Sequence, residues 1–444
     1  MKQILVLGAG RSAPFLIKYL LDNAEEHDWF VTVGDLSLEA AERAVARHPR
    51  SNAIPFDVND VDMRNGAISN ADIVVNLLAP VFQPMIANDC LVHRKHMVSA
   101  SYCNPQVRDL HTDALRHGVL ILTEMGLDPG IDHMSAMHLI EGIHARGGKI
   151  KKFCSYGGGL PAPGAVDNPL QYAITWNPRN VVMSGSDGAI FLEDGRLKII
   201  PHHRLFTQTW PVDVMGLGMM EGYANRDSVT YQHTFGLEDV ETLIRGTLRY
   251  PGFCETWSQI VKLGLPNETL SIPNLKDLSM YDLVSMFTPK HSGGSLEQRV
   301  ASYLNINPTG AVMQKLKWLG LFSNESLGAN GNTSTHMMVE LLNQKLVMPQ
   351  GARDMVILVH EMEVTYEHGP NEKITSTLIE YGEPGGITAM AKTVGMPLGI
   401  AVKLILNQEL PLTGVQIPTH PAIYKPILSE LASEGLAFQD VIEH

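Results

Sequence analysis

The sequence predicts an α/β protein built on a doubly wound parallel sheet. A glycine turn follows the first apolar run, and an acid ends the second. Six short apolar runs alternate with helix-length polar segments over the first 130 residues. Short apolar runs of this kind are typical of parallel strands covered by helices on both faces. Beyond about residue 150 the alternation breaks, and a chain of 444 residues is long enough for two or three domains.

The first element is expected to be a strand at residues 3–7, followed by a turn and a helix with apolar residues at helical spacing. In the turn, Gly8 permits the tight bend and Gly10 leaves room for a pyrophosphate against the backbone. Ala13 is the third small residue, which allows the helix to pack closely on the strand. A glycine pattern alone is weak evidence for a dinucleotide site.

The second strand, WFVTVGD, ends in Asp35. An acid at this position is expected to accept hydrogen bonds from an adenosine ribose. Its carboxylate would repel a 2′-phosphate, and the following LSLEAAER offers no basic residue before Arg43. We therefore expect NAD as the cofactor in preference to NADP.

Four further strands are expected in NAIPFDVND, ADIVVNLLAP, KHMVSASY and GVLILTEMGLDPG. Ligands of such sheets bind at the carboxyl ends of the strands. Any single strand end is polar in many proteins, but the set as a whole favours a bound dinucleotide. The candidate cofactor-binding residues are Gly8, Gly10, Arg11, Ser12, Ala13, Asp35, Asp57, Val58, Leu77, Leu78, Ala79 and Ser101.

The rest of the chain mixes element types. Two Asp-Gly turns in DGAIFLEDGRLKII predict a hairpin, and the pattern over residues 258–346 predicts a helical subdomain. DMVILVHEMEVTYE and KITSTLIEYG are expected to form a returning strand pair. The segment GITAMAKTVGMPLGIAVKLIL is expected to be the final helix and to pack on the nucleotide domain.

One stretch, SYGGGLPAPGAVDNPLQYAITWNPRNV at residues 155–181, has three consecutive glycines and four prolines. Such residues fix the backbone without supplying a hydrophobic face. The stretch is therefore expected to be either a dispensable surface loop or a wall that holds a ligand.

Composition excludes several function classes. The formal net charge of −13 argues against nucleic acid or an anionic membrane as partner, so an anionic substrate would need local arginines. The first apolar run is too short for a signal peptide or a membrane span, and a cytoplasmic location is expected.

The four cysteines are widely spaced, which indicates reduced thiols. His360 lacks a second histidine at metal spacing, so no metal site is expected.

Five segments carry a family resemblance: GLDPGIDHMSAM, GGGLPAPGAVDNPLQYAITWNPRNV, EGYANRDS, RGTLRYPGF and AMAKTVGMPLGIAVKLIL. Through them the chain resembles the L-glutamate-forming saccharopine dehydrogenases, also called saccharopine reductases. The resemblance implies a Rossmann domain completed by the C-terminal segment, an inserted α/β domain with the substrate site and a homodimer contact, and a helical subdomain. The corresponding boundaries are 1–127 with 385–444, 128–257 with 347–384, and 258–346.

The resemblance also implies the chemistry, which is NAD(P)-dependent interconversion of saccharopine, a tricarboxylate, with L-glutamate and 2-aminoadipate 6-semialdehyde in lysine metabolism. Family positions that bind substrate are matched by Ser101, Tyr102, Asp128, Arg226, Thr247 and Arg249. Guanidinium groups suit carboxylates because they donate bidentately. Asp128 or Tyr102 could relay protons, given a pKa shifted toward neutrality. The family usually has a cysteine where this chain has Gly157.

Two alternatives remain open at this point. One is a related reductase that joins an amine to a different aldehyde, such as a carboxyspermidine-type synthase. The other is a non-catalytic nucleotide-binding protein on the same scaffold, in which loss of the arginines would be expected. Arg226 and Arg249 are present, which favours an enzyme.

Overall fold

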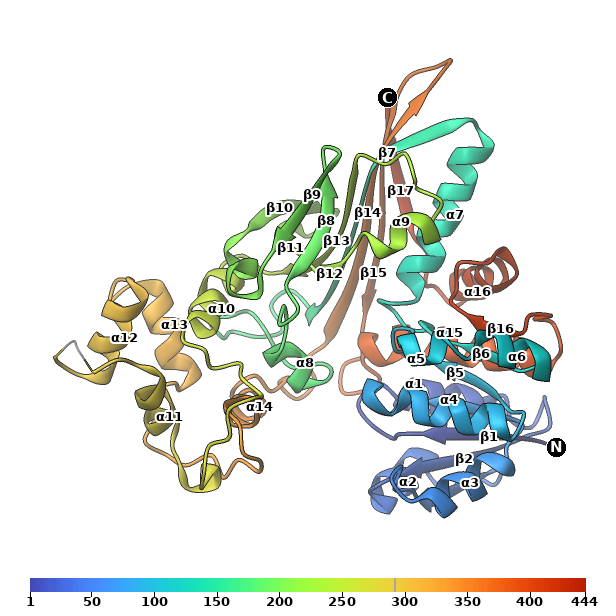
Figure 1. Ribbon diagram of the computed structural model, residues 1–444, viewed down its shortest axis with the longest axis horizontal. Coiled ribbons are helices and arrows are strands. Elements are labelled where there is room, and N and C mark those ends of the chain that lie inside the picture. Colours follow the sequence, from blue (N-terminus) through green and yellow to red (C-terminus); the bar gives the residue numbers. More distant parts are fainter. Residues whose placement is uncertain (291–292) are drawn as a thin grey trace. The chain divides into compact units, whose positions relative to one another are not determined.

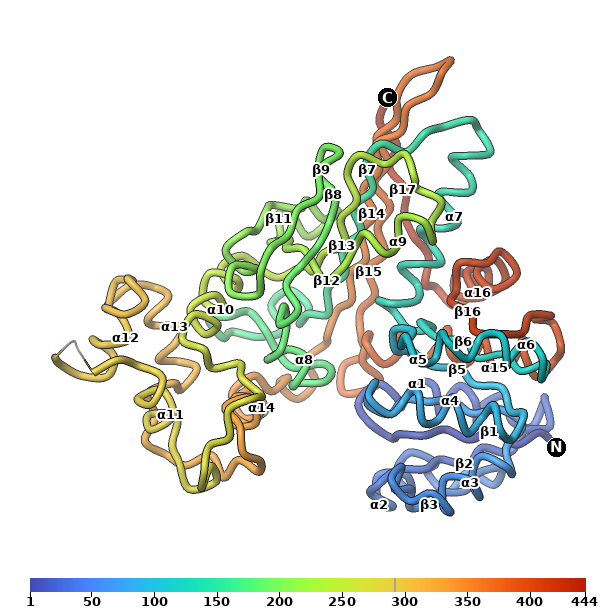
Figure 2. Tube along the Cα trace, in the orientation of Figure 1, coloured from blue at the N-terminus to red at the C-terminus, as the bar shows by residue number. Residues whose placement is uncertain are grey.

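The computed structural model describes residues 1–290 and 293–444 (Figures 1 and 2). The chain forms two compact units. The first comprises residues 1–149, 365–370 and 378–440, and the second comprises residues 150–364, 371–377 and 441–444. The three-domain boundaries expected from the sequence stay a prediction.

The first unit contains a seven-stranded parallel sheet, which confirms the predicted fold class. Its six N-terminal strands are those expected from the apolar runs, and a short C-terminal strand pairs with β6 and completes it. In spatial order the strands are β16 (Gly414–Gln416), β6 (Leu120–Leu122), β5 (His96–Ser99), β4 (Ile73–Asn76), β1 (Lys2–Leu7), β2 (Trp29–Asp35) and β3 (Ser51–Pro55). Chain order reverses between β4 and β1, which makes this point the topological switch where ligands of such sheets bind.

Helices connect these strands, and their starts follow local capping rules. Ser37 Oγ accepts a hydrogen bond from Ala40 N, and the Asp60 side chain accepts one from Met63 N. The helices of this unit are α1 (Pro14–Asp22), α2 (Leu38–Val45), α3 (Val61–Ser69), α4 (Gln83–Val92), α5 (Pro105–Arg108), α6 (His111–His117), α7 (Ile131–Ala145), α15 (Ala389–Leu406) and α16 (Pro421–Ser433), with the 3-10 turn η1 (Pro80–Phe82).

The expected docking of the C-terminal apolar helix on the nucleotide domain is confirmed, because α15 packs against α1. Two glycines allow the close approach. A Cβ at Gly395 would lie 2.6 Å from Leu16 N, and one at Gly399 would lie 2.4 Å from the Tyr19 ring. The expectation that this is the final helix is wrong, since α16 follows it. By length and composition α15 could cross a membrane, but 78% of its 18-residue window is buried inside the fold.

The second unit is organised around a ten-stranded mixed sheet. Its main path runs β10 (Thr209–Val214), β11 (Gly218–Ala224), β13 (Thr242–Arg249), β7 (Gly148–Pro161), β14 (Asp354–Tyr366), β15 (Glu372–Tyr381) and β17 (Gln439–Glu443), with β8 (Ala189–Glu193), β9 (Arg196–Ile200) and β12 (Arg226–Asp227) beside it. The predicted hairpin is β8–β9, whose turn residues Asp194 and Gly195 both have positive φ. The predicted returning pair is β14 and β15.

The glycine-rich stretch is only partly a loop, so the alternative of a dispensable surface loop is wrong for its first part, while a role as a ligand wall stays a prediction. Residues 155–161 belong to the central strand β7 and most of them are buried; the parallel pairing of β7 with β13 covers residues 152–157. The glycines make room for neighbouring side chains: a Cβ at Gly158 would lie 3.2 Å from Leu248 Cβ, and one at Gly246 would lie 2.7 Å from the Tyr156 ring. Period-two patterning gives no sign of this, because glycine contributes no apolar side chain to the count.

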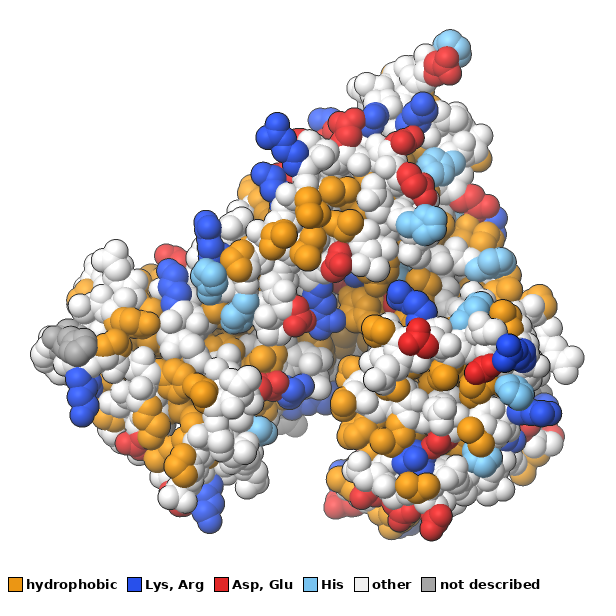
Figure 3. Space-filling model, viewed as in Figure 1, with side chains coloured by type: hydrophobic (Ala, Val, Ile, Leu, Met, Phe, Trp, Pro, Cys, Tyr) orange, Lys and Arg blue, Asp and Glu red, His pale blue; other side chains and the backbone are white. Residues whose placement is uncertain are grey.

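The predicted helical stretch is confirmed within the described residues of the second unit. Two of its helices begin with capping boxes, at Ser279 with Asp282 and at Ser295 with Gln298. The helices of this unit are α8 (Pro178–Val182), α9 (Thr230–Thr234), α10 (Phe253–Lys262), α11 (Met280–Phe287), α12 (Leu296–Leu304), α13 (Ala311–Leu319) and α14 (Ser334–Lys345), with the 3-10 turns η2 (His202–Thr207) and η3 (Leu275–Asp277). On the face drawn in Figure 3, basic and acidic side chains are interspersed rather than gathered by sign.

Candidate active site

The turn after β1 has the geometry of a dinucleotide site. Gly8 has a φ of +104°, and a Cβ there would lie 3.2 Å from Leu77 O at the end of β4. Gly10 differs, since a Cβ built on it would have no atom within 4 Å. The backbone at Gly10 therefore faces open space, as close approach of a pyrophosphate requires.

Asp35 lies beside this turn at the end of β2. Its Oδ2 accepts a hydrogen bond from Ala9 N at 2.8 Å, and its Oδ1 accepts one from Ser37 N at 2.9 Å. These two amides fix the carboxylate next to the open glycine. A turn with room for a pyrophosphate and an acid at the ribose position fit an NAD(P) cofactor.

The other candidate cofactor residues lie at the same carboxyl edge of the sheet. Arg11, Asp57 and Ala79 are exposed, while Val58 is buried. The remaining ones are half-buried and could form walls of the site, namely Ser12, Leu77, Leu78 and Ser101.

The structure brings the two proton-transfer candidates together. The Tyr102 hydroxyl donates a hydrogen bond to Asp128 Oδ1 at 3.1 Å, and both side chains are half-buried. Tyr102 follows β5 and Asp128 follows β6, so neighbouring parallel strands deliver them to one edge. The pair joins a phenol and a carboxylate in hydrogen-bond contact, an arrangement that can pass a proton.

Sequence reasoning missed a buried polar cluster beside this pair. Glu124, at 3% exposure, contacts His133, at 1% exposure, through Oε2 and Nε2 at 2.8 Å. His133 Nδ1 also lies 3.0 Å from Asp132 Oδ2. Asp132 and His133 stand within the quoted motif GLDPGIDHMSAM, which was the available signal. No cluster of three metal-ligating side chains occurs among the described residues.

In the second unit, Arg249 ends β13 and is 3% exposed. Its guanidinium lies over three aromatic rings, with its carbon 5.1 Å from the Tyr172 centroid, 5.8 Å from Tyr223 and 5.4 Å from Phe253. One nitrogen donates to the carbonyl of Leu248 at 2.8 Å, and Nε has no hydrogen-bond partner. Within the described part of the chain no carboxylate forms an ion pair with Arg249. A buried cation normally has an anionic partner, so this site fits a carboxylate ligand.

Arg226 and Thr247 are less buried than Arg249. Arg226 is exposed and has a φ of +54° in the short strand β12. Thr247 is half-buried on β13, where it pairs with Tyr223 of β11 on one side and with Gly157 of β7 on the other.

Cys154, the cysteine nearest in sequence, does not take the place of the family cysteine at Gly157. Cys154 lies three residues earlier on β7, so it faces the opposite side of the sheet from position 157. Burial raises the pKa of the Cys154 thiol to about 12. Cys154 is therefore both misplaced and protonated at neutral pH.

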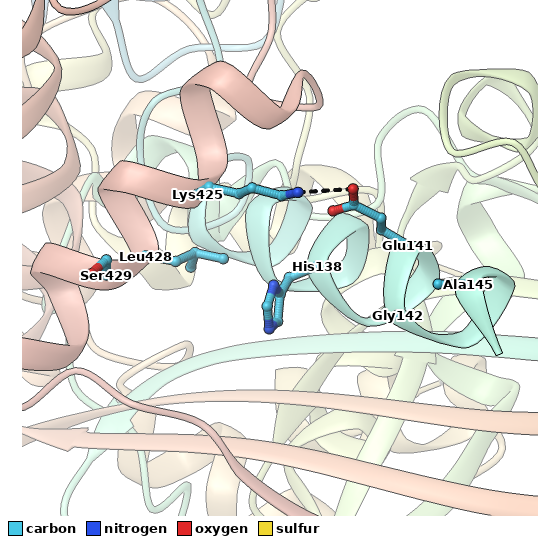
Figure 4. A pocket seen from close by; sticks show the side chains of 7 residues that line it. All are labelled: His138, Glu141, Gly142, Ala145, Lys425, Leu428 and Ser429. Atoms are coloured by element: carbon cyan, nitrogen blue, oxygen red, sulfur yellow. Dashed lines mark hydrogen bonds and ion pairs between the residues drawn. The ribbon is translucent and has the colours of Figure 1, made fainter.

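A surface pocket of about 520 Å³ lies elsewhere in the first unit, between α7 and α16 (Figure 4). Its lining includes His138 and an ion pair between Glu141 and Lys425, with Lys425 Nζ 2.8 Å from Glu141 Oε1. None of the candidate site residues lines this pocket.

Comparison with known proteins agrees with the geometry. The Saccharopine dehydrogenase NADP binding domain family matches residues 4–122, and the Saccharopine dehydrogenase C-terminal domain family matches residues 126–436. The saccharopine dehydrogenase [NADP(+), L-glutamate-forming] of Schizosaccharomyces pombe is 34% identical over 450 residues, covering 100% of this chain and 99% of its own. That of Saccharomyces cerevisiae is 33% identical, covering 97% and 96%.

Among solved structures, the fold matches the apo histidine-tagged saccharopine dehydrogenase (L-Glu forming) from Saccharomyces cerevisiae. The TM-score is 0.86 with 29% identity, and the match covers 100% of both chains. The chain therefore belongs to the L-glutamate-forming saccharopine dehydrogenase family.

Proposed function

We propose that this protein interconverts saccharopine with L-glutamate and 2-aminoadipate 6-semialdehyde, using NAD(P). The observation that carries the proposal is the full-length match to proteins named for this reaction, in sequence and in fold. The buried Arg249, without an ion-pair partner in the described chain, supports a substrate that brings its own carboxylate.

The chemistry assigns roles to residues of this chain. The turn of Gly8 and Gly10 together with Asp35 would hold NAD(P)+, which would supply the hydride acceptor for the substrate carbon next to the secondary amine nitrogen. The resulting imine adds water and splits into an amine, glutamate, and an aldehyde. Arg249 and Arg226 hold substrate carboxylates, while Asp128 accepts a proton released during oxidation and hydrolysis, with Tyr102 as its hydrogen-bond partner.

The direct test measures formation of reduced cofactor with saccharopine beside a panel of related secondary amines, including carboxyspermidine. Saccharopine is expected to be the preferred substrate. Turnover of another amine without turnover of saccharopine would establish the related reductase instead. Cofactor binding with no turnover of any amine would favour the non-catalytic scaffold.

We infer a preference for NAD over NADP, although the names of the relatives specify NADP(+). The Asp35 carboxylate, fixed by Ala9 N and Ser37 N, would repel a 2′-phosphate. Steady-state kinetics with both cofactors should give a higher kcat/KM with NAD, and Asp35→Asn should narrow the difference, since the amide can still accept from Ala9. Glu42→Gln removes an exposed acid from the neighbouring α2 and should leave the ratio unchanged. A clear preference of the wild type for NADP would reject the inference.

We also expect Arg226→Asn to lower kcat/KM for saccharopine by about tenfold, because a charge-assisted contact to a carboxylate is lost. Asparagine tolerates the positive φ of this position, so backbone strain is avoided. The affinity for NAD(P), measured by fluorescence titration, should not change. Arg196→Asn, at an exposed arginine of β9, serves as the control. Unaltered kcat/KM in Arg226→Asn, or loss of cofactor binding instead, would contradict the assignment.

A further inference from the structure

The buried contact between Glu124 and His133 joins two loops that carry the proton-transfer candidates. Glu124 Oε1 accepts a hydrogen bond from Cys103 N at 3.0 Å, and Glu124 N donates to Ser101 O at 3.0 Å. These two groups flank Tyr102 directly in the chain. Glu124 therefore holds the backbone on both sides of Tyr102.

The other end of the cluster holds the loop of Asp128. Asp132 Oδ1 accepts a hydrogen bond from Gly130 N at 2.6 Å, two residues after Asp128. Asp132 Oδ2 lies 3.0 Å from His133 Nδ1, which is an ion-pair distance without hydrogen-bond geometry, and His133 Nε2 contacts Glu124 Oε2 at 2.8 Å. A continuous chain of polar contacts thus runs from the Tyr102 loop to the Asp128 loop.

A second buried side chain acts on the same loop. Gln83, at 1% exposure, accepts a hydrogen bond from Asn104 N at 3.1 Å and donates to Ser101 O at 3.4 Å. Four consecutive residues from Ser101 to Asn104 are therefore anchored at Ser101, Cys103 and Asn104, and Tyr102 is the one whose side chain reaches Asp128.

A glutamate at position 124 costs folding free energy, so a purely structural role would be filled more favourably by an apolar residue. A buried carboxylate is unfavourable unless its oxygens are satisfied, and Glu124 also has a φ of +61°, which disfavours non-glycine residues. Strained polar positions of this kind occur where the surrounding structure must hold a functional geometry. The groups that Glu124 satisfies are the backbone of the Tyr102 loop and the His133 ring.

We propose that Glu124, oriented by His133, is a positioning residue that holds Tyr102 against Asp128 for proton transfer. The inference rests on the proposed function for the identity of the reaction. Glu124 acts through the loop backbone and does not itself touch the substrate. Its contribution is to the placement of the phenol, and small misplacements of reacting groups have large effects on rate.

The test compares Glu124→Ala with the isosteric Glu124→Gln in the full chain. Alanine removes the acceptor for Cys103 N and should lower kcat by about tenfold, with the Kd for NAD(P) unchanged. Glutamine keeps an oxygen that accepts from Cys103 N, and its NH2 can donate to His133 Nε2 once the ring carries its proton on Nδ1, which faces Asp132. It should restore kcat to within about threefold of the wild type. Leu431→Ala, a buried truncation in α16, controls for general loss of stability.

A double-mutant cycle makes the claim specific. In a Tyr102→Phe background the hydroxyl is absent, so Glu124→Ala should have little additional effect on kcat. If Glu124→Ala does not fold, His133→Leu provides the second variant, because it removes the group that contacts Glu124. It should lower kcat with the Kd for NAD(P) unchanged, whereas His133→Gln, which can still donate to Glu124, should keep kcat near that of the wild type. Normal kcat in Glu124→Ala, equal losses in the alanine and glutamine variants, or full additivity with Tyr102→Phe would each overturn the proposal.

Failure of the proposed function can be distinguished from failure of the positioning role of Glu124. Absence of saccharopine turnover in the wild type would reject the reaction but not the positioning role. That role is then measured by the pH titration of the Tyr102 phenol, taken as the absorbance difference between each protein and its Tyr102→Phe counterpart. A titration shifted by Glu124→Ala and restored by Glu124→Gln supports the proposal, and an unshifted titration overturns it.

Discussion

Arg249→Met is expected to lower kcat/KM for saccharopine by about a hundredfold or more while leaving the protein at least as stable. Truncating one partner of a buried, hydrogen-bonded charge pair costs about 2 to 5 kcal/mol of binding. In the free protein the guanidinium is buried among three rings, and no carboxylate of the described chain pairs with it. Methionine is shorter than arginine, but its flexible thioether can pack against the same rings and it carries no charge that must be desolvated. These gains are expected to offset the lost contacts with the rings and with Leu248 O, so the unfolding free energy should not fall.

Two measurements check this expectation. Steady-state kinetics give kcat/KM, and thermal unfolding is followed with and without saccharopine. The ligand should raise the Tm of the wild type but not that of Arg249→Met, because binding to the native state stabilises it by mass action. Arg245→Met is the matched control, since Arg245 is a buried arginine of the same strand that lies 4.6 Å from the Tyr231 centroid. Arg245→Met should leave kcat/KM for saccharopine close to that of the wild type.

A large fall in Tm for Arg249→Met would show that the charge stabilises the fold through a partner within the protein. Unchanged kcat/KM would show that no substrate carboxylate depends on it. The second result would remove Arg249 from the substrate site and leave Arg226 as the remaining arginine candidate.

The strands of the nucleotide-binding sheet were predictable because each is a short run of apolar residues between polar segments. Strand β16 was not, since Gly414–Gln416 contains one apolar residue and gains its place through pairing with β6. The glycines of β7 were misjudged for a related reason. Gly158 of β7 leaves room for Leu248 of β13, and Gly246 of β13 leaves room for the Tyr156 ring; such contacts between neighbouring strands leave no periodic trace in the sequence.

The site residues show the same division. Gly8, Gly10 and Asp35 could be placed because their roles follow from one local turn. The sequence could not show that Arg249 is buried and Arg226 is exposed. Burial of an arginine depends on which distant segments pack over it, and the residues next to it in the sequence do not determine that. The contact of Glu124 with His133 depends on the tight turn at residues 126–130, which lies between these two residues in the chain. Gly130 packs so tightly there that a Cβ would lie 2.0 Å from Gly126 O.

The Asp128 assignment is the one on which the proposed chemistry depends most directly. Asp128→Asn is expected to lower kcat by about a hundredfold or more, because an amide cannot accept a proton as a general base. Asparagine keeps the shape and an oxygen that can accept from the Tyr102 hydroxyl, so the 3.1 Å contact can persist. The loss would then reflect chemistry rather than a displaced loop.

The pH dependence of kcat distinguishes two roles for Asp128, a general base or a structural residue in the turn ahead of Pro129. A general base must be deprotonated to act, so kcat falls at low pH as the carboxylate is protonated, and Asp128→Asn should lack this acidic limb. Tyr102→Phe is the companion variant, which removes the hydroxyl but retains the carboxylate and therefore the limb. If Asp128 only shapes the turn, Asp128→Asn should lower Tm while kcat and its acidic limb stay near those of the wild type. That outcome would assign proton transfer to Tyr102 or to bound water, because Gly157 offers no titratable group and Cys154 faces the other side of the sheet.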